Sequence, residues 1–105
     1  MEITKEMVEE AVQKFIKMDS GNRSFSEAYH KGEPFYYKRH NILIVPSEII
    51  NRYFGCNLYR MSANLVESLQ NYGAKRAYRQ LYENGKQGNA ILTWIFDVRD
   101  FRKEV

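Results

Sequence analysis

The chain has little of what disulfides, metal sites and membrane spans require. Its single cysteine, Cys56, excludes an intrachain disulfide and a zinc site built on cysteines. We interpret Cys56 as a small buried hydrophobic residue rather than a thiol nucleophile. The longest apolar run, Ile42–Val45, is far shorter than a membrane span. The acidic N-terminal residues lack the apolar stretch of a signal peptide, so we expect a cytoplasmic protein without membrane contact.

Residues that carry catalysis are equally scarce. His30 and His40 are the only histidines, and their spacing does not fit a helical metal-binding pair. The acidic residues show no paired-carboxylate pattern. The segment ENGKQG lacks the Gly-Lys-Ser/Thr ending of a phosphate-binding loop and does not open a helix. The sequence therefore predicts no enzyme, no metal and no cofactor.

Positive charge is concentrated in the middle of the chain. Residues 1–34 carry five Lys or Arg and seven Asp or Glu, whereas residues 35–82 carry seven Lys or Arg and only two Glu. Residues 83–105 carry four of each, and the net charge is +3. This asymmetry favours a nucleic acid or an acidic protein as partner, although a solvated basic face with no partner would look the same.

Two helices are predicted in the first third. Apolar residues at three- and four-residue spacing predict a helix over residues 5–18, with Thr4 as its N-cap. The stripe forms either core or a dimer interface, and includes Val8, Val12 and Phe15. Ser24 and Glu27 fit a capping box that opens a short helix over residues 25–30.

The middle of the chain predicts a strand and a second pair of helices. Residues 41–45 favour a strand, preceded by a turn or short helix at 37–40. Ser47 is expected to cap a helix that ends at Gly55. After a connector over residues 56–61, Ser62 is expected to cap a helix that ends at Gly73.

A hairpin follows this helix pair. Residues 77–82 and 90–96 alternate as paired strands around Asn84-Gly85, a strong hairpin signal. The segment 83–89 predicts a tip longer than a two-residue turn, and residues 97–105 a short helix or frayed tail.

The order helix, helix, hairpin is that of a winged helix. We therefore predict one α+β domain over residues 1–105, a winged helix with an added N-terminal helix. The helical extension covers residues 1–34, and the helix-turn-helix and wing cover residues 41–97.

The second helix of the pair would then lie in a DNA major groove. Its short polar side chains suit contact with bases, and they are Asn64, Ser68 and Asn71. Glu67 on the same helix repels phosphate, and a merely solvated face is the alternative. Basic residues around the helix pair and wing would contact phosphates, and they are Arg52, Arg60, Lys75, Arg76, Arg79 and, in the wing, Lys86.

Aromatic residues lie among these cations. Tyr78 and Tyr82 would stack on unpaired bases if they are exposed, or belong to the core. Residues 36–40, YYKRH, form a second basic and aromatic cluster, which either extends the same surface or is an irregular loop packed on the sheet.

Residues 41–97 resemble the small winged-helix region at the C-terminus of phage and mobile-element primase–helicase proteins. The resemblance rests on a helix ending in Leu-x-x-x-Gly at Leu69–Gly73, the basic pair Lys75-Arg76, and Trp94 in the last strand. It implies binding of double- or single-stranded DNA, or docking to a replication protein, in replication or transcription control. Because the chain has no ATPase motif, it implies no helicase or primase activity.

A rival interpretation is a small protein-binding inhibitor or adaptor of a host enzyme, of the kind that anti-CRISPR proteins represent. It predicts an exposed aromatic patch and little salt-dependent DNA binding. A winged helix that reads a palindrome would also need a homodimer.

Overall fold

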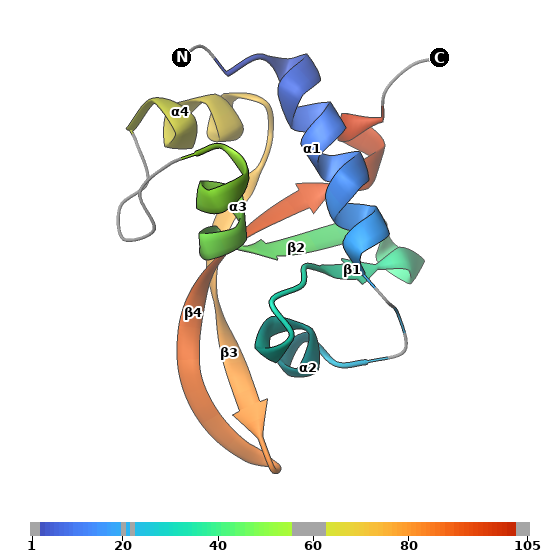
Figure 1. Cartoon of the computed structure of the whole chain (residues 1–105), viewed down its shortest axis with the longest axis vertical. Helices are drawn as coiled ribbons and strands as arrows, with labels where there is room; N and C mark the ends of the chain where they lie inside the picture. Colours follow the sequence, from blue (N-terminus) through green and yellow to red (C-terminus); the bar gives the residue numbers. More distant parts are fainter. Residues whose placement is uncertain (1–2, 20, 22, 56–62, 103–105) are drawn as a thin grey trace.

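An antiparallel sheet of four strands runs through the molecule, and helices pack against both of its faces (Figure 1). The computed structural model describes residues 3–19, 21, 23–55 and 63–102. The described helices are α1 (Lys5–Met18), α2 (Phe25–His30), α3 (Ser47–Tyr53) and α4 (Ala63–Asn71). The strands are β1 (Phe35–Tyr37), β2 (Ile42–Pro46), β3 (Lys75–Glu83) and β4 (Lys86–Asp97), and 3-10 helices cover Lys38–His40 and Val98–Phe101. The fold class is therefore α+β, as the sequence predicts.

The strand order is β1-β2-β4-β3, so the last strand lies inside the sheet. After β2 the chain passes through α3 and α4, returns as the edge strand β3, and turns back as β4 between β2 and β3. Trp94 in β4 consequently lies opposite Val45 on one side and Arg76 on the other.

The larger core fills the face that α1, α3 and α4 cover. Val8, Val12 and Phe15 of α1 are almost completely buried there against Leu43, Val45, Trp94 and Phe96 of the sheet. The apolar stripe of α1 is thus core and supplies no dimer interface. Phe101, at the end of the last 3-10 helix, is also fully buried, so residues 98–101 are anchored rather than frayed.

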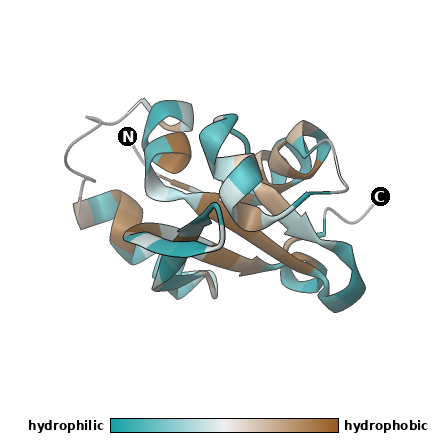
Figure 2. Ribbon diagram, turned by 90° about the horizontal axis from the view of Figure 1, so that it is seen from below, coloured by the Kyte–Doolittle hydropathy of each residue, from teal (hydrophilic) through white to brown (hydrophobic). Residues whose placement is uncertain are grey.

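A second, smaller core lies on the opposite face beneath α2. It is centred on Phe25 of α2, Ile44 of β2 and Leu81 of β3. Because both faces are covered, β2 has no solvent side, which explains why residues 42–45 are uninterruptedly apolar. Figure 2 shows this hydrophobic band along the strands between more hydrophilic helices.

Local capping fixes the first two helices where the sequence places them. The Thr4 hydroxyl accepts the amide of Met7 at 3.2 Å, and the Ser24 hydroxyl accepts the amide of Glu27 at 3.2 Å. Ser24 is thus confirmed as the N-cap of α2, and its hydroxyl also donates to the Glu27 carboxylate at 3.3 Å.

A nearly buried ion-pair network attaches the end of α1 to the start of the sheet. The guanidinium of Arg23, whose side chain is 3% exposed, forms ion pairs with Asp19 and Glu33. Asp19 also accepts the amide of Tyr36 in β1. These contacts hold the connections on both sides of α2, and so set its position on the second face.

Two local predictions are wrong. Ser47 caps nothing: it is the first helical residue, and Pro46 occupies the N-cap position without a side-chain hydrogen bond. The wing tip is also shorter than predicted, because β3 ends at Glu83 and β4 begins at Lys86. Asn84 and Gly85, with φ of 51° and 75°, form a two-residue turn of the kind that matches strand twist. The predictions for Cys56, Arg60 and Ser62 lie outside the described residues.

The hairpin of β3 and β4 is the longest feature of the molecule. It extends along the 41 Å long axis, beyond the helices at one end, with α2 beside it (Figure 1). Its register shifts between Gln80 and Tyr82, where β4 gains a residue near Gly88. A Cβ on Gly88 would lie 3.4 Å from the Leu81 carbonyl oxygen, an ordinary van der Waals contact.

Candidate nucleic-acid interface

Four of the predicted site residues lie on one hairpin. Residues 75–90 carry four cations and one acid, Glu83. Within the part of the chain that the structure describes, no carboxylate forms an ion pair with these cations, which are Lys75, Arg76, Arg79 and Lys86. The Glu83 carboxylate instead lies 3.0 Å from the Nε2 atom of His30 in α2. The hairpin therefore presents positive charge that no described carboxylate neutralises.

The strand pleat divides the cations between two faces. Arg76 lies opposite Trp94, on the face of the larger core, and its guanidinium is 5.6 Å from the centroid of the Trp94 ring. Lys75 and Arg79 point to the other face, because alternate residues of a strand share a side. Their register partners Ile95 and Ile91 pack against the smaller core. A ligand that contacts all of these cations must reach round the edge of β3.

Helix α2 supports the distal part of the edge strand. The Arg79 guanidinium lies 5.1 Å from the centroid of the Phe25 ring, within cation–π range. The backbone amide of Tyr82 donates to the Ser26 hydroxyl at 2.8 Å, so this outward amide of the edge strand is satisfied by α2. The position of Arg79 and Tyr82 is therefore determined by α2 as well as by β4.

Two tyrosines of β3 are markedly exposed. Tyr78 is 75% exposed and Tyr82 is 60% exposed, whereas Leu81 between them is 5% exposed. Neither tyrosine belongs to a core, so the interpretation of these two residues as core is wrong. Aromatic rings among uncompensated cations are what base stacking requires.

The predicted recognition helix has a weaker surface. On α4, Asn64 and Asn71 are exposed and Ser68 is half-buried, so all three approach solvent. The helix contains no Lys or Arg, and its Glu67 is exposed. Helix α4 thus carries polar side chains that could contact bases, but the positive charge that would bind phosphates lies on the hairpin.

Arg52 lies apart from the hairpin cations. It lines an open pocket of about 250 Å³ between α2 and α3, together with Tyr29, His30 and Glu48. Partial burial, followed by the negative charge of Glu48, raises the pKa of the Tyr29 phenol. Tyr29 is therefore a neutral hydrogen-bonding group at physiological pH. Arg60 is outside the described residues.

Sequence reasoning missed the contribution of α2. The sequence predicts a short helix in which Phe25 faces the core, yet Phe25 and Ser26 also contact Arg79 and Tyr82 across more than fifty residues of chain. No local pattern signals this contact. The only available hint is that the predicted helix is too short to be stable without a surface to pack on.

Other classes of site find no support in the described residues. These residues hold no group of three or more potential metal ligands, and none of their helices has the length and apolar character that crossing a membrane demands. No protein-family model, curated protein or solved structure matches the chain.

Proposed function

We propose that this protein binds DNA without catalysing a reaction, and that the β3–β4 hairpin supplies most of the affinity. The observation that carries the proposal is the group of four hairpin cations without a described carboxylate partner. Cations of this kind are available to replace counterions on phosphates, which is the main source of nonspecific DNA affinity.

The order of elements supports the finer proposal of a winged helix. A helix, a strand, two helices and a hairpin follow one another as α1, β2, α3, α4, β3 and β4, and the final strand pairs with β2. The hairpin would be the wing, while α2, β1 and the first 3-10 helix would be an insertion between α1 and β2. The resemblance of residues 41–97 to winged helices of primase–helicase proteins supports a role in replication or transcription control of a phage or other mobile element.

Within this proposal α4 has a secondary role. Asn64 and Asn71 can bond base edges, and asparagine suits adenine in the major groove. Because Glu67 beside them repels phosphate, this surface would adjust sequence preference rather than affinity. Asn64→Ala should accordingly change the ranking of DNA sequences more than the mean affinity.

Fluorescence anisotropy with random duplex and single-stranded DNA, across a salt series, tests the proposal. If the four hairpin cations each contact a phosphate, the logarithm of the duplex association constant should fall against log salt with a slope of about −3.6. Absence of binding at low salt would refute DNA binding altogether.

Charge reversal at Lys75 and Arg76 tests whether the DNA affinity comes from the hairpin. Lys75→Glu with Arg76→Glu should weaken binding to all sequences and reduce the magnitude of the salt slope by roughly two. The matched control is Lys38→Glu with Arg39→Glu, which changes the net charge equally at another exposed Lys-Arg pair. Thermal melting should first show that each variant is folded, since Arg76 packs on Trp94. If both double variants lose DNA affinity equally, the loss reflects the change in net charge and not a contact made by the hairpin.

A protein partner is the second candidate, and a different surface favours it. An open concavity of about 430 Å³ between α1 and α3 is lined by Met7, Glu10, Lys14, Tyr53 and Phe54. Its Lys14 ammonium lies 5.5 Å from the centroid of the half-exposed Tyr53 ring. If DNA binding is absent, a host enzyme that this protein inhibits or adapts becomes the leading proposal, and Tyr53→Ala should then weaken its capture.

A further inference from the structure

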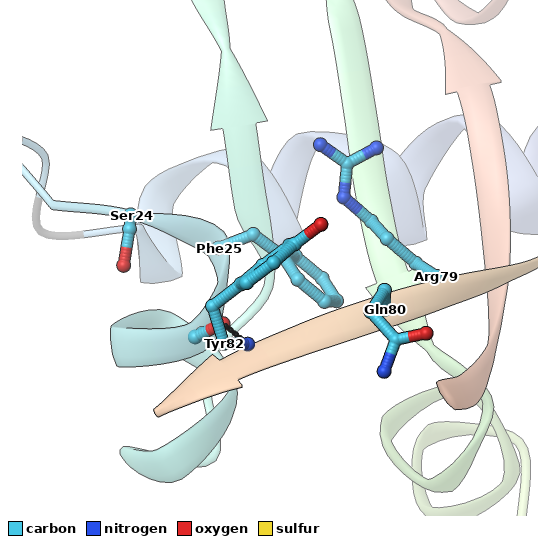
Figure 3. Close-up of a pocket in the computed structure, with 6 residues that line it drawn as sticks. Ser24, Phe25, Arg79, Gln80 and Tyr82 are labelled. Carbon is cyan, nitrogen blue, oxygen red and sulfur yellow. Dashed lines mark hydrogen bonds between the residues drawn. The ribbon is translucent and has the colours of Figure 1, made fainter. Parts of the chain in front are cut away.

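An open pocket of about 340 Å³ lies between the start of α2 and the edge strand β3 (Figure 3). Ligand pockets range from roughly 300 to 1,000 Å³, so this one has room for a single small planar group. Its walls are formed by Ser24, Phe25, Ser26, Arg79, Gln80 and Tyr82.

The walls of the pocket are held in place from two directions. The Tyr82 amide is tied to Ser26, and the Gln80 side-chain amide donates to the Gly88 carbonyl oxygen across the hairpin. The Arg79 guanidinium lies over the Phe25 ring, and Figure 3 shows the Arg79 and Tyr82 side chains on the same side of β3 as Phe25. In this view the Arg79, Tyr82 and Phe25 side chains lie near one another, whereas the Gln80 amide and the Ser24 hydroxyl extend away from them.

The chemistry of these groups selects a flat, polar-edged ligand. The Tyr82 ring, still 60% exposed, offers a stacking surface, and the planar guanidinium of Arg79 offers a second. The Gln80 amide oxygen, on the wall of the pocket, can accept a hydrogen bond from a ring edge. The charge of Arg79, which no described carboxylate neutralises, suits a neighbouring phosphate.

We propose that this pocket takes one unpaired nucleobase of single-stranded DNA. This inference rests on the proposed DNA-binding function and specifies the strand state that the hairpin prefers. A base within a duplex is stacked on both sides, so neither of its faces can meet Tyr82. An unpaired base offers both its faces and its Watson–Crick edge. The hairpin would thus hold DNA at a junction, where duplex phosphates meet an open strand.

The test compares two tyrosines of the same strand. Tyr82 lines the pocket and Tyr78 does not, and both are exposed enough for leucine to replace them at little cost in stability. Binding of Tyr82→Leu and Tyr78→Leu is measured by anisotropy on a blunt duplex and on the same duplex with a single-stranded overhang of about six nucleotides.

The wild-type protein should bind the overhang duplex more tightly than the blunt one. Tyr82→Leu should lower affinity for the overhang duplex by about fivefold or more, the smaller end of what one stacked base contributes. Its affinity for the blunt duplex should change less than about twofold, and Tyr78→Leu should behave as wild type on the overhang. A 2-aminopurine in the overhang should lose fluorescence on binding wild type and keep it with Tyr82→Leu.

Three results would overturn the proposal, and they differ from failure of DNA binding itself. Equal losses on both DNAs, equal losses in both tyrosine variants, or unchanged binding by Tyr82→Leu would each rule out the pocket as the base site. In each case the wild-type protein would still bind duplex DNA in a salt-dependent way. If the wild-type protein binds neither DNA, it is the proposed function that fails.

Discussion

The two ends of the β3–β4 hairpin belong to one continuous ladder, but one end is buried in the body of the molecule and the other is exposed to solvent. At the body of the molecule, Thr93 and Trp94 of β4 are 0% exposed and lie under the helices. Toward the turn, Tyr78 and Tyr82 of β3 are 75% and 60% exposed and belong to no core. The comparison separates two roles: the buried side chains of β4 at the proximal end contribute stability, and the exposed tyrosines of β3 toward the turn present their rings to solvent.

The distal end is nevertheless not a bare hairpin. An isolated two-stranded hairpin is only marginally stable in water. Here Phe25, Ser26 and His30 of α2 contact Arg79, Tyr82 and Glu83 in turn. A six-residue helix therefore gives the exposed end enough support to hold a fixed shape without burying its surface.

The largest effect should come from the proximal end. Trp94→Ala removes the largest fully buried side chain at the centre of the sheet. It should lower the free energy of unfolding by about 3–5 kcal/mol, because the cavity adds to the lost burial. Denaturant unfolding measures this loss. Tyr78→Ala at the distal end is the control, expected to change stability by less than about 0.5 kcal/mol. Comparable losses in the two variants would contradict the division of roles.

An intermediate effect is expected where α2 meets the edge strand. Ser26→Ala removes the acceptor of the Tyr82 amide and should lower the free energy of unfolding by about 1 kcal/mol. Hydrogen exchange should localise the change, with faster exchange at Tyr82 and unchanged protection at Trp94. Ser47→Ala is the matched control, because the Ser47 hydroxyl caps no helix. Unaltered exchange at Tyr82 would mean that β4 alone holds the distal end.

The smallest effect should come from the C-terminal end of β4, where Asp97 precedes the last 3-10 helix. Hydrogen bonds from the Arg99 side chain and then its backbone amide lower the pKa of the Asp97 carboxyl. A lowered folded-state pKa stabilises the protein above the unfolded value, near pH 3.9, and the gain is lost as pH falls through the folded value. Asp97→Asn should therefore lower Tm slightly at neutral pH, and the difference should close below about pH 4. A difference that persists in acid would assign the effect to the cap geometry instead.

Much of the fold could be predicted because its signals are local. The bounds of α1 and α2 follow from Thr4, Ser24 and the spacing of apolar residues, all within a few positions of the helices they define. Asn84-Gly85 likewise predicts the hairpin, since both residues tolerate positive φ. The predicted length of the tip is wrong because Lys86 and Gln87 pair with Glu83 and Tyr82 of the opposite strand. The Gly and Asn residues of this segment favour a loop, so the local sequence does not indicate that pairing.

Less of the candidate site could be predicted. The sequence by itself determined that Lys75, Arg76, Arg79 and Lys86 fall on one hairpin with Tyr78 and Tyr82, because strand alternation and turn chemistry are short-range. Only the tertiary structure decided that α2 covers the second face of the sheet and brings Phe25 and Ser26 to the edge of β3. That contact joins segments more than fifty residues apart through burial of apolar surface, and burial is not directional, so no local pattern records which surface a short helix will choose.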